Sequence, residues 1–375
     1  MKVLFVVSGL GGHGAEDQVI LLSKELARLG HAAAIYCLSG RTGRLHELDG
    51  SGVEVLVDDK RGPLDPAVLW RLRRHVRRWR PDLVHAFGFD ADVYSRIADL
   101  SASAAVLNSE RTDDQRVSRV QRLGYRLTSF FCDGVVANTR AGAEFARRLH
   151  RLSEERIDVL WNIVDLQAID ARIARSPRAA HGIFPGPGLK RLCMVASIRP
   201  VNDHPLALRT LKRLVEQDPS WRLICVGEEP DDARGYRAQV LGERDRLGLE
   251  PFVQFVGHRS DVVELIASSD VLLVTSKHGG FPLVALEAMA SNTAVVSTEW
   301  GEVPRLLPFP EQIPVSRAEA DIAAAVLRCH ERRDQIKAAQ RRWAEQHGTA
   351  SAGAANLLAV YTKYLPAAGI RVEPA

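Results

Sequence analysis

Residues 271–290, VLLVTSKHGGFPLVALEAMA, constrain the fold more than any other stretch of the chain. Val271 to Thr275 is a short apolar run rich in β-branched residues, which is typical of a buried strand. Two adjacent glycines and Pro282 follow, and this composition favours a loop. From Leu283 onward the residue types suit a helix, whose first turn tolerates a proline. The stretch therefore predicts a strand, a glycine-rich turn and a helix start.

The helix start in this stretch predicts an anion site. The first N–H groups of a helix have no intrahelical partner, and the helix dipole places positive charge beside them. A phosphate is the most natural occupant of such a site. Glu287 follows within the first turns and could accept hydrogen bonds from the hydroxyl groups of a sugar. The spacing leaves open an alternative, a plain strand-to-helix turn with Glu287 as an ordinary helix-start carboxylate.

Strand and helix patterns alternate along most of the 375 residues. This alternation predicts an α/β protein with parallel, doubly wound sheets, whose ligands bind at the carboxyl ends of the strands. Residues 176–190, SPRAAHGIFPGPGLK, are rich in proline and glycine and are interpreted as the linker between two such domains. We expect one domain over residues 1–180 and a second over residues 181–345.

Cysteine usage and hydropathy exclude several classes of protein. The five cysteines are scattered, odd in number and without C-x-x-C spacing, so they predict buried free thiols rather than a disulfide frame or a metal site. The sequence also lacks an 18-residue apolar run and the pattern of a signal peptide. We therefore expect a cytoplasmic protein without a metal centre or a bound cofactor.

A glycine loop near the start spells the dinucleotide-binding fingerprint as Gly9-x-Gly11-x-x-Gly14. The fingerprint needs an acidic residue at the end of the second strand to hold a ribose. That strand, AAIYCLSG, ends without one. The interpretation as a nicotinamide-dependent enzyme is therefore disfavoured.

The net charge of +4 is concentrated in two basic stretches. Residues 69–80, LWRLRRHVRRWR, place apolar residues at helical spacing with arginines around them, and residues 116–126 form a second basic stretch. An ordinary arginine-rich surface helix is one interpretation. A helix that rests on an anionic membrane, with tryptophan at the level of the headgroups, is the other. Nucleic acid is disfavoured as a partner because no stacking platform, zinc spacing or helix-turn-helix accompanies the charge.

The central stretch also resembles a known family. Gly280-Phe281-Pro282 followed by Glu287-Ala-Met-Ala is similar to the "EGFPxxxxEAMA" signature of the retaining glycosyltransferase family 4. The resemblance implies the GT-B fold, in which two Rossmann-like domains face a central cleft. It implies that the phosphates of a nucleotide sugar lie on the helix start and that Glu287 holds the ribose. The first Glu of the signature, which holds the donor sugar, is replaced by Gly279.

A second segment, Val195 to His204 (VASIRPVNDH), resembles the family's "VGRLxxxKGH", whose Arg and Lys grip the diphosphate. Ser197 stands at the Arg position and Asn202 at the Lys position, while Arg199 supplies one cation nearby. The resemblance also implies that the base lies near Gly257-His258-Arg259. The donor-side residues that it implies are Gly12, Asn202, Gly257, His258, Arg259, His278, Gly279, Gly280, Phe281, Pro282, Leu283, Val284 and Glu287.

The first half resembles the acceptor domain of the family. GGHGAEDQVILLSKEL is similar to "GGAExxvxxLAxxL", and PDLVHAF is similar to "PDVVHxH" with Phe87 at the second histidine. His85 is either an acceptor-side catalytic residue or a core histidine at a strand end. Asn162 stands at a family Asn and Ile163 at the usual Gly. The acceptor-side residues that the resemblance implies are Gly11, His13, Phe87, Asp90, Glu110 and Arg111.

The resemblance covers nearly the whole chain and implies a retaining, metal-independent glycosyltransferase with His85, Arg199 and Glu287 as its catalytic residues. The expected donor is a UDP- or GDP-sugar. The expected acceptor is a glycan or lipid-linked hydroxyl in bacterial envelope polysaccharide synthesis. Residues 346–375 are expected to cross back to the first domain. Two alternatives stay open: a degenerate homologue that acts as a partner of an active transferase, and other nucleotide chemistry on the same fold.

Overall fold

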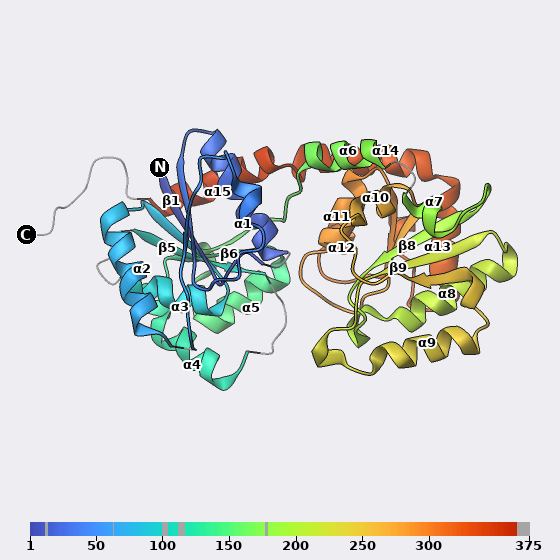
Figure 1. The fold of residues 1–375 in the computed structure, drawn as a ribbon, viewed down its shortest axis with the longest axis horizontal. Coiled ribbons are helices and arrows are strands. Elements are labelled where there is room, and N and C mark those ends of the chain that lie inside the picture. The colour runs from blue at the N-terminus through green and yellow to red at the C-terminus, as the bar shows by residue number, and fades with distance from the viewer. Residues whose placement is uncertain (12–13, 63, 100–103, 112–116, 177–178, 366–375) are drawn as a thin grey trace, which may run out of the picture. The chain divides into compact units, whose positions relative to one another are not determined.

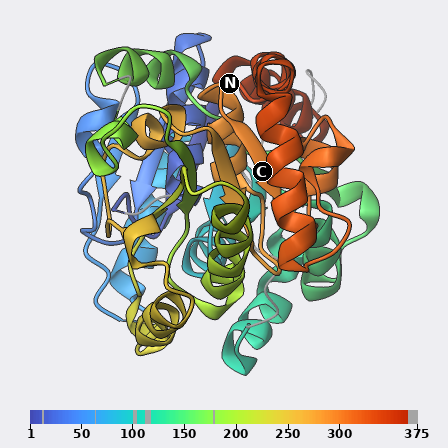
Figure 2. The same cartoon turned by 90° about the vertical axis from the view of Figure 1, so that its right-hand side faces the viewer.

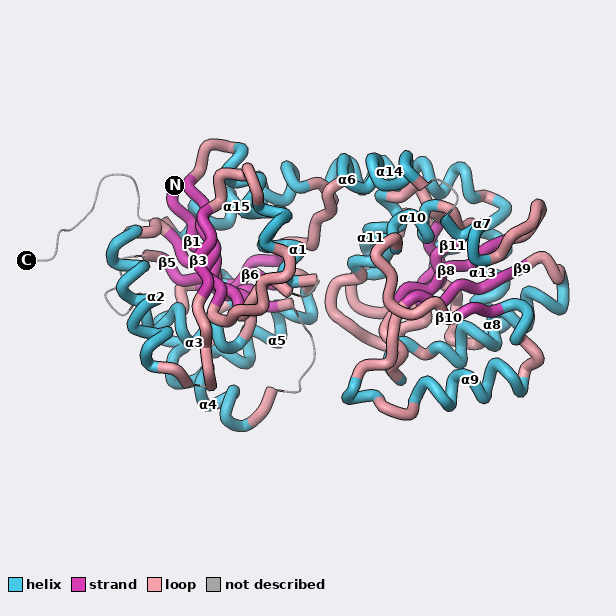
Figure 3. The backbone as a smooth tube through the Cα atoms, viewed as in Figure 1, coloured by secondary structure: helices cyan, strands magenta, loops and turns pink. Residues whose placement is uncertain are grey.

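The computed structural model describes residues 1–11, 14–62, 64–99, 104–111, 117–176 and 179–365. The chain divides into two compact units. The first contains Met1–Ile163 and the chain from Ala350 onward, and the second is Val164–Thr349. Each unit contains one parallel sheet with helices around it (Figure 1). The strands form two separate groups, one in each unit (Figure 3).

The first unit alternates strands and helices as the sequence patterns predict. Its strands are β1 (Lys2–Val7), β2 (Ala32–Cys37), β3 (Glu54–Val57), β4 (Leu83–Phe87), β5 (Ala105–Glu110), β6 (Gly134–Ala137) and β7 (Ile157–Val159). Its helices are α1 (Ala15–Arg28), α2 (Pro66–Trp79), α3 (Phe89–Ala98), α4 (Arg119–Thr128), α5 (Arg140–His150) and α15 (Ala350–Tyr364).

The first sheet has the strand order β3-β2-β1-β4-β5-β6-β7, and all its described pairings are parallel. β1 is central because its run VLFVV is apolar on both sides, as a strand covered by helices on both faces requires. Helices α1 and α15 pack against one another, and Leu357 and Tyr361 of α15 belong to the same buried cluster as Phe5. Helix α15 therefore completes the core of the first unit.

The second unit repeats this architecture with fewer strands. Its strands are β8 (Lys190–Val195), β9 (Trp221–Val226), β10 (Val253–Phe255), β11 (Val271–Val274) and β12 (Ala294–Ser297). Its helices are α6 (Leu166–Arg175), α7 (Ala179–Ile183), α8 (His204–Gln217), α9 (Tyr236–Arg246), α10 (Val262–Ala267), α11 (Leu283–Ala290), α12 (Val303–Leu306), α13 (Glu319–Glu331) and α14 (Arg333–His347).

The second sheet has the strand order β10-β9-β8-β11-β12 and is also parallel throughout its described pairings. Helices cover both of its faces (Figure 2). Helices α8 and α13 pack against each other, and so do α11 and α14. Because β8 and β11 are neighbours, the loops after these two strands emerge at the same edge of the sheet. The donor-side residues after both strands are brought together there.

The division between the units differs from the expected boundaries at 180 and 345. The segment 176–190 is not a linker between domains, because it contains α7 and packs within the second unit. The Ala180 N–H donates to Ser268 Oγ at 2.7 Å, and Arg191 donates to the Phe184 carbonyl at 2.8 Å. Arg172 of α6 pairs with Glu264 of α10 at 2.8 Å. The proline- and glycine-rich composition of residues 176–190 predicted an irregular segment, but this segment lies within the second unit and does not join the two units.

The basic stretch 69–80 forms most of α2. Asp65 caps this helix by accepting from the Ala67 and Val68 N–H groups, and Pro66 occupies its first position. Val76 faces the core, while Trp79 is half-buried and stacks on His75. None of the described helices is long and apolar enough to cross a bilayer.

Candidate functional site

The loop between β11 and α11 is the centre of the candidate donor site. Its first residues are tied to the loop after β8: Thr275 Oγ1 donates to the Asn202 carbonyl at 2.7 Å and Ser276 Oγ donates to Asn202 Oδ1 at 3.1 Å. Arg317 donates to the carbonyls of Thr275 and Ser276, both at 2.8 Å, and to Asp203 Oδ2 at 2.9 Å. These bonds hold the start of the β11–α11 loop against the loop that follows β8.

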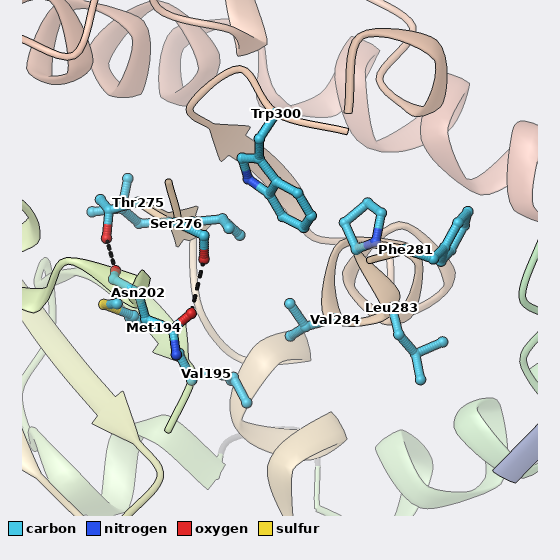
Figure 4. Close-up of a pocket in the computed structure, with 13 residues that line it drawn as sticks. Met194, Val195, Asn202, Thr275, Ser276, Phe281, Leu283, Val284 and Trp300 are labelled. Atoms are coloured by element: carbon cyan, nitrogen blue, oxygen red, sulfur yellow. Dashed lines mark hydrogen bonds between the residues drawn. The ribbon is translucent and has the colours of Figure 1, made fainter. Parts of the chain in front are cut away.

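A cavity of about 180 Å³ lies at the carboxyl ends of β8 and β11 (Figure 4). This is the edge where open parallel sheets bind their ligands. Pockets that hold a whole ligand as large as a nucleotide sugar have volumes of about 300 Å³ or more. The volume of this cavity therefore suits one part of a nucleotide sugar. The cavity is lined by Met194, Val195, Ala196, Asn202, Leu273, Val274, Thr275, Ser276, Phe281, Pro282, Leu283, Val284 and Trp300.

The start of α11 opens onto this cavity. Pro282 precedes the helix, and no described side chain caps it. The Leu283 N–H donates to the Phe281 carbonyl at 2.8 Å, which fixes the turn. Glu287 is half-buried on α11, three and four positions after Val284 and Leu283. Residues at these spacings share one face of a helix, but Glu287 itself is not among the residues that line the cavity.

Gly279 and Trp300 are complementary in size. A Cβ atom at Gly279 would lie 3.2 Å from Cζ3 of the Trp300 ring. Figure 4 shows the indole directed between the Asn202 side and the α11 side of the cavity. The buried Trp300 Nε1 has no hydrogen-bond partner in the described chain. Sequence analysis missed Trp300, although its place just after β12, the strand next to β11, was a usable signal.

The two polar candidates after β8 are already engaged. Asn202 Nδ2 donates to the Ser197 carbonyl at 2.8 Å, so both ends of this amide hold loops together. Arg199 pairs with Asp232 at 2.8 Å and does not line the cavity. The structure therefore does not show Arg199 in the expected place for a phosphate ligand. Lys277 supplies a different exposed cation, 3.6 Å from Asp203 Oδ2.

The residues expected near the base follow β10, at the same edge of the sheet but two strands beyond β8. Gly257 follows β10 and bridges Gly227 after β9, with an N–H to carbonyl distance of 2.9 Å. The His258 N–H donates to Glu228 Oε1 at 3.2 Å. Arg259 is held by two bonds of 2.7 Å to Asp261. None of the three lines the cavity, and His278 is exposed in the loop after β11.

The first unit contains a separate cavity of about 790 Å³ at the carboxyl ends of its strands. It brings together Gly11 and Asp90, two of the acceptor-side residues, and Asp90 pairs with Lys60. Gly12 and His13 lie outside the described residues. The cavity is lined by Ser8, Gly9, Gly11, Glu16, Leu38, Ser39, Arg41, Lys60, Arg61, Gly62 and Asp90.

His85 is a core residue in this structure, so the assignment of a direct contact with the acceptor is corrected. Its side chain is 0% exposed, and Nδ1 lies 2.7 Å from the hydroxyl of Tyr361 in α15. Burial lowers the pKa of His85 well below its ordinary value, so the ring is neutral. The alternative of a core histidine at a strand end describes the residue correctly.

Phe87, Glu110 and Arg111 are also largely withdrawn from solvent. The Arg111 guanidinium lies 5.0 Å from the centre of the Phe87 ring and donates to Asn162 Oδ1 at 2.7 Å. Burial lowers the pKa of Arg111 to about 10. These three residues do not line the cavity that contains Gly11 and Asp90. The acceptor-side set is therefore split between a cavity and a buried cluster.

Comparisons with known proteins agree with this geometry. A family model described as Glycosyltransferase Family 4 matches residues 12–168, and one described as Glycosyl transferases group 1 matches residues 189–332. The chain is 29% identical over 174 residues to a D-inositol 3-phosphate glycosyltransferase of Mycobacterium sp. strain KMS, covering 46% of this chain and 38% of that protein. It is 28% identical over 230 residues to the Nocardia farcinica protein of that name, covering 60% and 48%. The chain thus spans less than half the length of these relatives.

Solved structures show the same fold at low identity. A glycosyltransferase from Rickettsia africae superposes with a TM-score of 0.81 at 16% identity, covering 97% of this chain and 98% of that one. HepE of Anabaena, in complex with UDP, superposes with a TM-score of 0.80 at 18% identity, covering 97% and 100%. These are GT-B structures. The chain therefore belongs to the glycosyltransferases that the two family models describe, with a Glycosyltransferase Family 4 domain at residues 12–168 and a Glycosyl transferases group 1 domain at residues 189–332.

Proposed function

We propose that the protein transfers a sugar from a nucleoside diphosphate sugar to a hydroxyl group of a glycan or lipid-linked acceptor, with retention of configuration. The observation that carries this proposal is the cavity where the uncapped start of α11 meets the ends of β8 and β11. A helix start without a side-chain cap favours phosphate, and Glu287 follows the cavity residue Val284 by three positions. The UDP and UDP-glucose complexes of Anabaena HepE support UDP as the nucleotide.

The donor-side residues have distinct proposed roles. The Val284 N–H, at the positive end of the α11 dipole, and the Lys277 ammonium stabilise the charge that grows on the diphosphate as its bond to the sugar breaks. Glu287 accepts hydrogen bonds from the ribose hydroxyls. Trp300 covers the sugar and offers its unpaired Nε1 as a donor to a sugar oxygen. We propose that no metal takes part, because the helix start and the cation neutralise the phosphates.

The reaction itself exchanges one bond for another. The bond from the anomeric carbon to the diphosphate breaks through an oxocarbenium-like state, and the acceptor oxygen bonds to that carbon. The nucleoside diphosphate takes the electron pair of the broken bond, and one of its oxygens takes the proton of the acceptor hydroxyl. Attack from the face that the diphosphate leaves retains the configuration. This stereochemistry follows from the family and is part of the proposal.

The cavity of the first unit favours an acceptor that carries a phosphate. Arg41, Lys60 and Arg61 line it together with two carboxylates, Glu16 and Asp90, so its cations outnumber its anions. Lipid-linked glycans and phosphorylated polyols both carry such a group, and the sequence relatives are named for D-inositol 3-phosphate. We propose a role in bacterial envelope glycan synthesis at the inner face of the membrane, with the basic helix α2 attracted to anionic lipid.

A second candidate function is that of a non-catalytic partner of an active transferase. The observation that favours it is the engagement of the expected diphosphate ligands: Arg199 pairs with Asp232, and both ends of the Asn202 amide are bonded. A site without these ligands binds a nucleotide sugar weakly. This function predicts no turnover of donor by the isolated protein and activity only with a partner subunit.

Calorimetric titration of UDP, GDP, ADP and dTDP tests these proposals. We expect one nucleotide to bind the wild type and Glu287→Ala to weaken it over a hundredfold, since two hydrogen bonds to a carboxylate contribute about 1.5–3 kcal/mol each. Glu331→Ala, an exposed glutamate at the end of α13, is the matched control and should bind as wild type. If no nucleotide binds the wild type, the donor-site proposal fails and the partner function gains support.

A further inference from the structure

A row of large apolar side chains faces solvent on α4 and the short 3₁₀ turn η2 (Ser129–Phe131) that follows it. Val120, Leu123, Leu127 and Phe130 are 77%, 57%, 70% and 89% exposed. The first three lie at i, i+3 and i+7, so they share one side of α4. We call these four residues the apolar row. Single exposed apolar residues are ordinary, but a contiguous row marks an interaction surface.

The apolar row is exposed although α4 itself is packed firmly against the first unit. The opposite side of α4 is firmly seated: Tyr125 is buried and donates to Asp92 at 3.0 Å, and Gly124 lets the helix approach Phe89. Ser118 and Gln121 form a capping box at the start of the helix. The helix is therefore fixed on the first unit with its apolar row outward.

A row of arginines runs beside the apolar row. Arg119, Arg122 and Arg126 repeat the i, i+3, i+7 spacing and are exposed. Within the described part of the chain, none of the three has a carboxylate at ion-pair distance. Residues 117–131 contain these three arginines and no Asp or Glu. Among the residues that the structure describes, the segment therefore presents an apolar strip bordered by arginines without ion-pair partners.

A groove of about 200 Å³ lies where the arginine row meets α5. Arg122, Arg126 and Arg148 surround it, and Phe145 and Leu149 give it an apolar floor. Glu144 also lies on α5 and binds Arg147 at 2.9 Å and Arg148 at 3.7 Å, so one of the three groove arginines is already paired. A phosphate group with a hydrocarbon chain beside it matches this combination.

We propose that the α4–η2 segment docks the protein on an anionic phospholipid bilayer, with the apolar row among the acyl chains and the arginine row at the lipid phosphates. The chemistry of the two parallel rows favours this occupant, because an interfacial helix needs apolar residues on one side and cations bordering them. A row of exposed apolar side chains also suits a fluid surface better than a shaped protein pocket. The inference does not rest on sugar transfer.

The basic helix α2 differs from α4–η2 in a way that separates their roles. Its apolar side, with Val68, Leu72 and Val76, is buried in the core. Trp70 is exposed and lies against Arg74, with 5.6 Å between the guanidinium and the ring centre. Helix α2 therefore offers charge with one aromatic residue, whereas α4–η2 offers charge and a complete apolar row.

Co-sedimentation with vesicles tests the proposal on the full chain. We expect wild type to bind phosphatidylcholine vesicles that contain phosphatidylglycerol and not to bind pure phosphatidylcholine vesicles. The triple variant Leu123→Ser, Leu127→Ser, Phe130→Ser should bind at least about tenfold more weakly, because its apolar contacts are gone. Val315→Ser removes an equally exposed apolar residue of the second unit and should bind as wild type.

Charge is tested separately with Arg122→Gln combined with Arg126→Gln, which should weaken binding and reduce its dependence on salt. All the substituted side chains are exposed, so melting temperatures and nucleotide titrations should match wild type, which separates this inference from the proposed donor site. Equal binding by the triple variant and wild type would overturn the proposal. So would a wild type that ignores anionic vesicles, or a concentration-dependent dimer that the triple variant abolishes.

Discussion

The contact between His85 and Tyr361 gives the sharpest test of how the first unit is built. Both side chains are 0% exposed, and the Tyr361 hydroxyl lies 2.7 Å from His85 Nδ1. His85 Nε2 already has no partner in the described chain. Tyr361→Phe removes the hydroxyl and leaves both ring nitrogens without partners. A buried orphan of this kind costs about 1–3 kcal/mol.

Thermal unfolding measures that cost. A domain of this size loses about 2–4 °C of melting temperature per kcal/mol, so a cost of about 2 kcal/mol predicts a loss of about 4–8 °C. His85→Leu alone leaves the tyrosine hydroxyl orphaned and should cost a similar amount. The double variant should be less destabilised than the sum of the single variants, because neither polar group remains.

The same variants test the correction to His85. If His85 is a core residue, the double variant keeps nucleotide binding and sugar transfer once it is folded. Two results would refute the reasoning. One is a melting temperature of Tyr361→Phe equal to that of wild type. The other is a double variant of wild-type stability that has lost transfer, because His85 would then act on the substrate.

Three further predictions concern single sites. Burial lowers the pKa of His204 to about 4 in the folded protein, below the value of about 6.5 in the unfolded chain. Between pH 6.5 and pH 4, His204 is therefore protonated in the unfolded chain and neutral in the folded protein. The free energy of unfolding should therefore fall by up to about 1.4 kcal/mol per pH unit as the pH drops through this range. His204→Leu should lack this pH dependence, which urea unfolding near pH 7 and near pH 5 measures. Gly353→Ala would place a Cβ into Ile163 Cγ2, so it should cost about 1–3 kcal/mol of stability in the first unit, and adding Ile163→Ala should recover part of it. Gly279→Glu would press on the Trp300 ring, so nucleotide-sugar affinity should fall rather than rise in calorimetry, and a rise would show that the indole yields freely.

Local patterns predicted the elements well because their causes are local. The apolar run at 271–275 became β11 over Val271–Val274, and the helix expected from Leu283 became α11 over Leu283–Ala290. The parallel sheets followed from the alternation of strands and helices. The cavity at the end of β11 was expected for the same reason, since strand ends and helix starts meet at one edge of a parallel sheet.

Side-chain partners that are distant in sequence were beyond the reach of those patterns. His85 is buried by a tyrosine 276 positions away, and nothing in the strand around it indicates this contact. Arg199 was expected on a phosphate, but it pairs with Asp232, which lies 33 positions further along the chain. Charge complementarity across a loop is a tertiary property, so a motif position alone did not locate the cation.

The residues that differ from the family signatures make close contacts with neighbours in the structure. Ile163 stands where the resemblance has Gly, and it packs on Gly353 of α15, where a Cβ would overlap it. Gly279 stands where the signature has Glu, and the ring of Trp300 lies against it. In each pair one residue is large and its neighbour is glycine. Reversion of Ile163 to Gly would leave a gap beside Gly353, whereas reversion of Gly279 to Glu would place a Cβ 3.2 Å from the Trp300 ring, so each position must be analysed together with its neighbour. At the proposed donor site, the Trp300 ring therefore lies next to the position where the signature has a carboxylate.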